Sequence, residues 1–179
     1  MAVVGRVEQL LVHPVKSMAA TPLERVEVTS AGLAGDRGRV VVDAATGERL
    51  REKTAPGLAA IDPTGDDAAA RVSAALGRTV RIEDAGAPQV MVAAVHLVSR
   101  QALERAAAGD VPAGCSAHDP RANVRLDLPE DDERDWVGRE LVLGGTRLLV
   151  TRLPRHCLGV YADVVTPGPV GVGDPVELG

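Results

Sequence analysis

Alternation of apolar and polar residues dominates both ends of the chain and predicts β-strands there. Side chains of a strand point alternately to its two faces, so a period of two marks a strand with one buried face. In the first part of the chain we expect strands at about 4–12, 23–29, 38–43 and 49–53. Pro14 ends the first strand, and residues 45–48 form a hairpin turn. These strands describe a small antiparallel meander.

The middle of the chain has helical patterning in two places. Asp66 or Asp67 is placed to cap a helix over 68–76, and Gly77 closes it. Ser99 is the expected N-cap of a second helix over 100–108, with Gly109 as its stop. Both helices are short and rich in alanine, so tertiary packing must stabilise them.

Strand patterning returns after the first helix and fills the rest of the chain. The expected strands are 79–83, 90–95, 123–128, 139–143, 146–153, 160–165 and 170–178. Gly144-Gly145 is typical of a type I′ hairpin turn. The sequence therefore predicts a mainly β fold with minor α content, in which a β-barrel core carries the two short helices packed outside.

Charge and composition narrow the class of protein. The chain has 179 residues and a net charge of −5, with no Phe, one Trp and one Tyr. An acidic chain without aromatic stacking platforms is not expected to bind nucleic acid or an anionic membrane. It has no apolar run near the ~18–20 residues of a membrane span and no signal-peptide pattern at its start. We therefore expect a cytoplasmic protein whose partner is a small molecule.

Two loops carry residue types that suit an anion. Lys16 and Ser17 follow the end of the first strand and offer a cation and a hydroxyl. Arg37 ends the glycine-marked segment 32–37 (GLAGDR), where backbone can approach a ligand closely. The alternatives are a solvated strand end in the first case and a β-turn with a surface Asp–Arg pair in the second.

Arg121 and Asn123 form another candidate contact. If the segment is extended, residues two apart share a face, so a fixed charge and an amide that can read a ring edge would lie side by side. The alternative is an edge strand with two polar side chains on its wet face.

Cys157 is the candidate reactive group. Arg155 and His156 precede it, and a neighbouring cation lowers the pKa of a thiol. Its thiolate would suit molybdenum, copper(I) or zinc, whereas the alternative is a buried, inert cysteine. Cys115 has no adjacent cation in the sequence. A disulfide between the two is open in principle but disfavoured in the cytosol.

Taken in order, several segments resemble the MOSC family. The segment 12–17 (VHPVKS) resembles its opening "YPVKS" strand, and 32–43 resembles "GLxGDRxxxVxD". Further likenesses are 96–99 (HLVS) before the central helix, 121–127 (RANVRLD) for "RPNxxxD", Cys157 at the reactive-cysteine position, and 159–176 for "GxY…PGxxxVGDxV". The resemblance implies a single compact unit over 1–179, with an N-terminal β meander over 1–60 and a MOSC core over 79–179.

The resemblance also implies a cofactor. Family members have a twisted β-barrel that binds the molybdenum cofactor, a pterin with a phosphate and a metal-holding dithiolene. Cys157 would then be the catalytic residue and metal ligand, or carry a persulfide. The expected cofactor-binding residues are Lys16, Ser17, Arg37, Ser99, Arg121, Asn123, Arg155 and Tyr161. Pyridoxal phosphate is associated with the family as well, but the chain offers no lysine context for it.

Three functions remain open at this point. The first is a molybdenum-dependent oxidoreductase acting on N–O or similar bonds and taking electrons from a separate protein. The second is a sulfur carrier that uses a persulfide on Cys157, and the third is a non-catalytic cofactor-binding module. Two departures from the family bear on them: residues 115–120 lack the family's aromatics, and 158–161 follow the cysteine without its usual loop.

Overall fold

The computed structural model describes residues 1–88, 92–116, 118, 120–129 and 132–179. Contacts divide the chain into two compact units. The barrel unit comprises residues 1–11, 22–34 and 92–179, and the helix–sheet unit comprises 12–21 and 35–91. The expected organisation of the chain as one compact MOSC-like unit stays a prediction.

The barrel unit is built on a closed sheet of seven strands. They are β1 (Ala2–Val12), β8 (Val95–Ser99), β9 (Val124–Asp127), β10 (Glu140–Leu143), β11 (Thr146–Arg152), β12 (Val160–Thr166) and β14 (Pro175–Leu178). The order is β14-β10-β11-β12-β8-β9-β1, and pairing of β1 with β14 closes the ring. Among the neighbouring strands of this ring, only β8 and β9 pair in parallel. Strand β2 (Thr21–Leu23) pairs with β1 on the side opposite β9.

Aliphatic side chains fill the barrel because the strands alternate. On β10, Leu141 and Leu143 are fully buried while the residues between them are partly exposed. Leu10 and Leu126 add to this core from β1 and β9. Trp136, at the end of the 3-10 helix η2 (Glu133–Trp136), is also fully buried. Inward-pointing residues of a small barrel fill its interior in this way.

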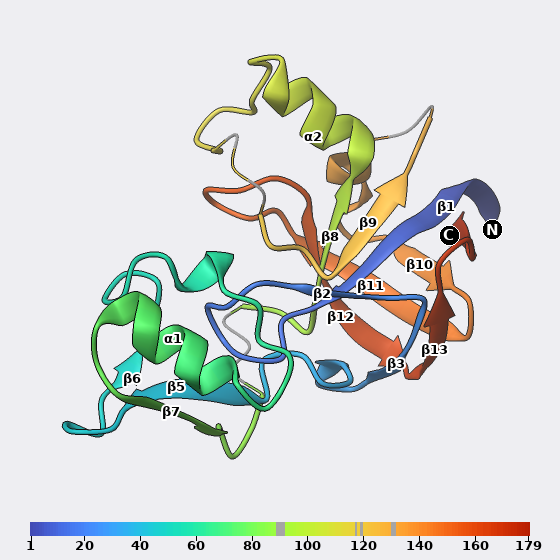
Figure 1. Cartoon of the computed structure of the whole chain (residues 1–179). Helices are drawn as coiled ribbons and strands as arrows, with labels where there is room; N and C mark the ends of the chain where they lie inside the picture. The colour runs from blue at the N-terminus through green and yellow to red at the C-terminus, as the bar shows by residue number, and fades with distance from the viewer. Residues whose placement is uncertain (89–91, 117, 119, 130–131) are drawn as a thin grey trace. The chain divides into compact units, whose positions relative to one another are not determined.

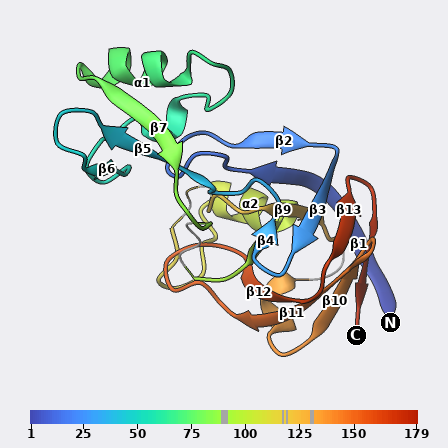
Figure 2. The same cartoon turned by 90° about the horizontal axis from the view of Figure 1, so that it is seen from below.

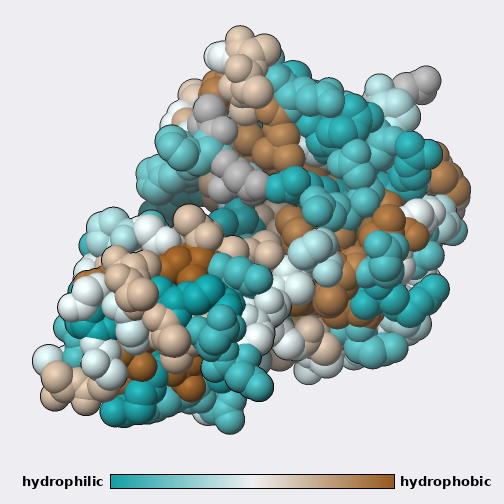
Figure 3. All heavy atoms as spheres, viewed as in Figure 1, coloured by the Kyte–Doolittle hydropathy of each residue, from teal (hydrophilic) through white to brown (hydrophobic). Residues whose placement is uncertain are grey.

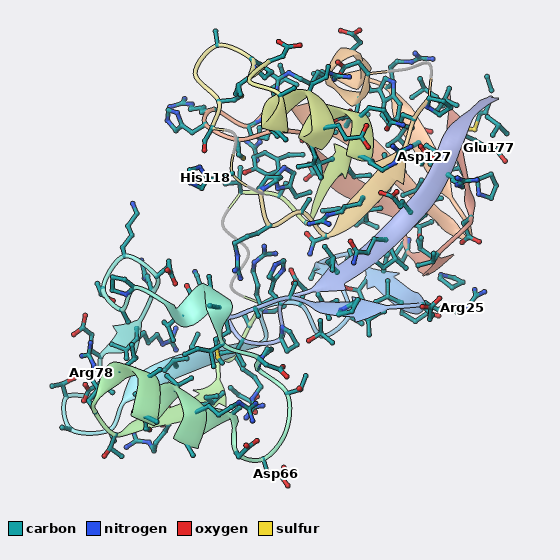
Figure 4. All side chains as sticks on the ribbon, turned by 45° about the horizontal axis from the view of Figure 1, so that its top comes forward. Arg25, Asp66, Arg78, His118, Asp127 and Glu177 are labelled. Carbon is teal, nitrogen blue, oxygen red and sulfur yellow. The ribbon has the colours of Figure 1, made fainter. Side chains whose placement is uncertain are left out.

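Helix α2 (Arg100–Ala107) connects β8 to β9, as a crossover between parallel strands requires. Ser99 caps it: its Oγ accepts a hydrogen bond from the backbone N–H of Ala102 at 3.0 Å. Figure 4 labels Asp127 where β9 runs beside β1. The Asp127 carboxylate accepts hydrogen bonds from Arg6 at 2.8 Å and Arg100 at 2.6 Å, which links β9 to β1 and α2.

A three-stranded sheet completes the barrel unit. Its strands are β3 (Arg25–Thr29), β4 (Gly32–Leu33) and β13 (Gly168–Gly171), in the order β13-β3-β4. Figure 1 shows β13 leading into β14 near the C-terminus.

The helix–sheet unit packs α1 (Ala68–Leu76) on a sheet of β5 (Arg39–Asp43), β6 (Arg49–Leu50) and β7 (Val80–Asp84), in the order β6-β5-β7. Figures 1 and 2 show α1 covering one face of this sheet. Its core contains Val15, Val41, Leu58 and Val72, with Leu58 supplied by the 3-10 helix η1 (Leu58–Ala60).

The fold class predicted from the sequence is confirmed: the protein is mainly β, with a closed barrel and two short α-helices. The helix over 68–76 has the expected bounds and ends at Gly77, whose φ is 64°. Asp67 stands at its N-cap position but makes no capping hydrogen bond, because its carboxylate pairs with Arg71.

Several expected strands have other bounds. The strand expected at 49–53 ends at Leu50, and the strand expected at 23–29 is interrupted at Glu24, where β2 ends and β3 follows. The strand expected at 90–95 begins at Val95 instead; residues 90 and 91 lie outside the described part of the chain. The strand expected over 170–178 is two strands, because the chain turns at Gly173 (φ 89°) and the Asp174 carboxylate accepts the N–H of Gly171 at 2.7 Å.

Among the described residues, no helix is long and apolar enough to cross a membrane. On the face shown in Figure 3, hydrophilic residues surround smaller apolar patches, as on most protein surfaces.

Candidate functional site

Backbone hydrogen bonds hold the predicted anion-binding loops together within the helix–sheet unit. The N–H of Arg37 donates to the carbonyl of His13 at 2.7 Å, and the N–H of Lys16 donates to the carbonyl of Arg39 at 2.9 Å. Val15 lies in the chain between His13 and Lys16, whose backbone groups make these two bonds, and it is fully buried in the core of the unit. Segments 13–17 and 36–39 therefore form one structure that carries Lys16, Ser17 and Arg37.

Asp36 anchors this structure from the inside. Only 5 % of Asp36 is exposed, and its Oδ1 accepts the backbone N–H of His13 at 2.7 Å. Its other oxygen, Oδ2, accepts a hydrogen bond from the guanidinium of Arg37, whose side chain is 19 % exposed. The alternative of a solvated surface Asp–Arg pair is therefore wrong, since burial of the carboxylate fixes the position of Arg37.

The backbone is unusual at three of the predicted ligand residues. In the described part of the chain, the non-glycine residues with positive φ are Ser17 (70°), Arg37 (50°) and Arg121 (57°). Such a conformation costs about 1–3 kcal/mol and persists where the surrounding structure imposes it, often at binding sites.

Positive charge gathers around Lys16. Burial lowers the pKa of Lys16 below 10.5, and repulsion from Arg51, Arg37 and Arg49 lowers it further. We call Lys16, Arg37, Arg49 and Arg51 the cation cluster. Like charges held together in this way favour binding of an anion, which relieves the repulsion. The sequence interpretation missed Arg49 and Arg51, which flank the buried Leu50 at the end of β6.

The surroundings of Cys157, in the barrel unit, differ from the expectation. Arg155 and His156 are exposed, and neither contributes to the shift in the pKa of Cys157. Burial raises the pKa of this half-buried thiol, and the nearby Tyr161 hydroxyl, 3.9 Å from the sulfur, opposes the rise. The predicted cation-stabilised thiolate is therefore wrong, because chain neighbours in a loop need not face one another.

Cys115 is the second thiol of this site. Its Sγ donates a hydrogen bond to the backbone carbonyl of Cys157 at 3.2 Å. The Nη1 of Arg134 lies 3.9 Å from the Cys115 sulfur. Arg134 therefore lies beside Cys115, although Cys115 has no cation next to it in the sequence. No local sequence signal could have found this, since Arg134 is 19 residues away.

His96 supports the cysteine site from β8. Its Nε2 is 2.8 Å from the carbonyl oxygen of Leu158, and its ring centroid is 4.7 Å from that of Tyr161. His96 and Tyr161 face each other in the register of β8 and β12. The sequence interpretation did not single out His96. Tyr161 lies near Cys157, and its role in cofactor binding stays a prediction.

Two predicted cofactor-binding residues have structural roles instead. Ser99 is completely buried and its hydroxyl caps α2, which leaves no surface for a ligand. Asn123 is 2 % exposed; its Oδ1 accepts the N–H of His96 at 3.3 Å and its Nδ2 donates to the carbonyl of Leu11 at 3.4 Å. Asn123 therefore joins β1, β8 and β9 from the inside rather than reading a ring edge.

Arg121 is partly exposed but does not share a strand face with Asn123. Its left-handed φ of 57° interrupts the extended backbone, and β9 begins only at Val124. Asp119, in the same motif, lies outside the described residues.

The candidate residues therefore form two sets. Lys16, Ser17 and Arg37 belong to the helix–sheet unit, and the barrel unit holds Arg121, Arg155, Cys157 and Tyr161. That both sets act on one ligand stays a prediction.

Comparison with known proteins places the N-terminal loops in a family. The model of the MOSC N-terminal beta barrel domain matches residues 4–114, which include the cation cluster. The chain belongs to this family. Cys157 and Tyr161 lie beyond the matched residues, so the family match does not extend to the candidate cysteine. No curated protein matches the chain.

One solved structure supports the fold of this MOSC family member. The YUAD protein from Bacillus subtilis matches with a TM-score of 0.56 and 16% identity, over 97% of this chain and 94% of that one. A structure described as a hypothetical protein matches with a TM-score of 0.48 and 12% identity, over 98% and 68%. At such identity the YUAD likeness shows the fold alone.

Proposed function

We propose that the chain is a molybdenum-cofactor-binding MOSC protein with oxidoreductase-type chemistry on N–O or similar bonds. The observation that carries the proposal is the cation cluster, which lies within the family match and surrounds Lys16, whose pKa is lowered first by burial and then by the neighbouring arginines. An acidic chain that places two further cations near Lys16 and Arg37 of the loop structure is suited to a small anion rather than to a polyanion.

The cluster fits a phosphate group by chemistry as well as by charge. Arg37 presents its guanidinium against the buried Asp36, so its geometry is set before any ligand arrives. A preorganised guanidinium binds phosphate oxygens in a bidentate manner, and a lysine adds a mobile point charge. In this proposal Arg37 orients the phosphate, Lys16 neutralises it, and Ser17 donates its hydroxyl.

The cysteine site fits one ligand of a metal that arrives with its own sulfur donors. Within the described ranges, no group of three or more His, Cys, Asp or Glu side chains could hold a metal ion. The dithiolene of the pterin would supply the further donors, and Cys157, half-buried near Tyr161, would add one thiolate. When bound, the cofactor would supply a redox-active metal centre, with electrons from a separate protein.

The first experiment measures molybdenum in protein made by a host that produces the cofactor. The proposal expects molybdenum in the wild type and its loss in Arg37→Ala. As control we choose Arg147→Ala, whose exposed side chain pairs with Glu140 in the barrel unit and which should retain the metal. Molybdenum-free wild type would overturn this proposal and leave the sulfur carrier and the non-catalytic module as the candidate functions.

The second experiment tests the anion site without the cofactor. Lys16 and Lys53 are the two lysines of the chain, so reductive ¹³C-methylation gives one NMR signal for each. Phosphate or a phosphorylated pterin should raise the pKa of Lys16 toward 10.5, because a bound anion offsets repulsion from the arginines. The signal of Lys53 should not respond. Arg37→Ala should weaken binding by about 1.5–3 kcal/mol, the range for a hydrogen bond to a charged group.

A sulfur carrier is the second candidate, favoured by the thiol of Cys115 next to Cys157. A persulfide on Cys157 could pass its outer sulfur on as sulfide when a neighbouring thiol attacks the inner one. Sulfane sulfur released by mild reduction from wild type, but not from Cys157→Ser, would support this function.

A further inference from the structure

Two thiols that are 42 residues apart in the sequence meet at one place in the barrel unit. The Sγ of Cys115 donates to the carbonyl of Cys157 at 3.2 Å. The chain neighbours of the two cysteines are also joined, because the N–H of Ser116 donates to the carbonyl of His156 at 3.1 Å. Both thiols are half-buried and free.

We propose that Cys115 and Cys157 form a reversible intramolecular disulfide, a dithiol switch distinct from cofactor binding. The backbone bond between Ser116 and His156 holds the two loops in register, so one thiol meets the other before it meets a second protein molecule. The inference does not rest on the proposed function, because it concerns the chain alone.

The surroundings of the pair suit thiol oxidation. Arg134 approaches the Cys115 sulfur at 3.9 Å and also lines a cavity of about 310 Å³. Leu158, the residue after Cys157, lines the same cavity. A small oxidant can therefore reach the loops that carry the two thiols. The Cys115 loop begins with a turn, in which the N–H of Cys115 donates to the carbonyl of Pro112 at 2.9 Å, and loops of this kind can shift to form the bond.

The reaction balances with a hydroperoxide as the oxidant. One thiolate attacks the peroxide, the O–O bond breaks, and the sulfur becomes a sulfenic acid while an alcohol or water leaves. The second thiol then attacks this sulfur, the S–S bond forms, and water is released. Two thiols are oxidised and one hydroperoxide is reduced. A dithiol reductant reverses the step by exchange.

The switch has a consequence for both functions proposed above. A sulfur held in the disulfide can neither ligate a metal nor accept a persulfide. Oxidation would therefore withdraw Cys157 from chemistry, and reduction would restore it. The same bond would join the 110–116 loop to the segment before β12.

Limited oxidation of the reduced chain by hydrogen peroxide tests the proposal, with dimedone present to trap sulfenic acid. Wild type should lose both free thiols together, lose the mass of two hydrogen atoms, form no disulfide between chains and give little dimedone adduct. Because the chain has two cysteines, Cys115→Ser and Cys157→Ser each keep one thiol and serve as matched controls. Both variants should accumulate the adduct instead, and dithiothreitol should restore both thiols of wild type.

A second measurement needs no variant. Peptide mapping should find the Cys115–Cys157 disulfide. When the protein is equilibrated with reduced and oxidised dithiothreitol, the yield of this disulfide should be at least about tenfold higher in native protein than in denaturant. Equal yields in both states, disulfides between chains, or dimedone adducts in wild type at the level of the variants would overturn the proposal. None of these readouts depends on molybdenum, so the switch and the cofactor proposal can fail separately.

Discussion

The cation cluster and the cysteine pair differ in how their chemistry is assembled. In the helix–sheet unit, Asp36 and Arg37 are chain neighbours that also interact, and they are tied to the loop at His13. In the barrel unit, Cys157 and its chain neighbours Arg155 and His156 do not act together, and Cys115 and Tyr161 take their place.

The difference follows from the kind of loop. A loop tied by several backbone hydrogen bonds, as at 13–17 and 36–39, keeps adjacent side chains on one structure. The segment after β11 is exposed at Arg155 and His156, so their side chains extend into water while the thiol turns inward. Adjacency in sequence therefore indicates a shared site where burial holds the neighbouring side chains together, as at Asp36 and Arg37.

The largest expected effect comes from removing the anchor of the cation cluster. Asp36→Ala leaves the N–H of His13 and the guanidinium of Arg37 without their buried acceptor. We expect a loss of about 2–4 kcal/mol in the free energy of unfolding. Urea unfolding checks this against the exposed Asp163→Ala, which should change stability by less than about 0.5 kcal/mol. Equal stability of the two variants would show that Asp36 anchors nothing.

The next effect separates structural from binding residues in the barrel unit. Asn123→Ala should cost about 1–3 kcal/mol of stability, because it leaves the N–H of His96 and the carbonyl of Leu11 without their side-chain partner. Its phosphate affinity should stay that of wild type. Arg121→Ala is the matched comparison and should show the smaller loss of stability. Calorimetry measures the unfolding and the phosphate binding of both variants. Weaker phosphate binding by Asn123→Ala would contradict a purely structural role of Asn123.

Local signals account for the parts of the fold that the sequence predicted. The helix over 68–76 could be predicted because Asp67 and Gly77 mark the two ends of an alanine-rich run. Closure of the barrel needs Ala2 to pair with Leu178, which patterning alone does not show. The alternation of each strand predicted a barrel, but not which strands are neighbours.

The same division holds for the candidate site. Lys16 and Arg37 could be predicted because strand ends and glycine turns are local features. Arg134 could not, since only the fold brings it to Cys115. Asn123 was misinterpreted because a polar residue at the start of a strand looks the same whether it binds a ligand or ties strands together inside the core.

The alkylation of Cys157 sharpens the contrast between the two thiols. Because burial raises the pKa of Cys157, its reaction with iodoacetamide in Cys115→Ser protein should be slower at pH 7 than that of a free cysteine peptide. The rate should rise with pH to a midpoint above the ordinary value. Tyr161→Phe should move the midpoint higher still, since the Tyr161 hydroxyl lowers the pKa of Cys157. A midpoint below that of the free peptide would restore the cation-stabilised thiolate expected from the sequence.

The smallest expected effect tests the strain within the cation cluster. The pKa of Lys16 is lowered in the folded protein, so its charged form is less favourable there than in the unfolded chain. Below the folded pKa the cost of burying this charge, together with repulsion from the arginines, reduces stability, and the penalty disappears as pH rises through the folded pKa toward 10.5. Lys16→Met should therefore be slightly more stable than wild type at pH 7, with an advantage that shrinks at high pH. At the same time it should bind phosphate less tightly.

Thermal unfolding between pH 7 and pH 11 measures this advantage, and Lys53→Met, at an exposed position, is the control. A gain in stability coupled to a loss of phosphate affinity is the signature of charge held for a ligand rather than for the fold. If Lys16→Met is instead less stable than wild type at pH 7, the charge of Lys16 stabilises the loop. The cation cluster would then be a structural feature, and the anion site would have to be sought elsewhere.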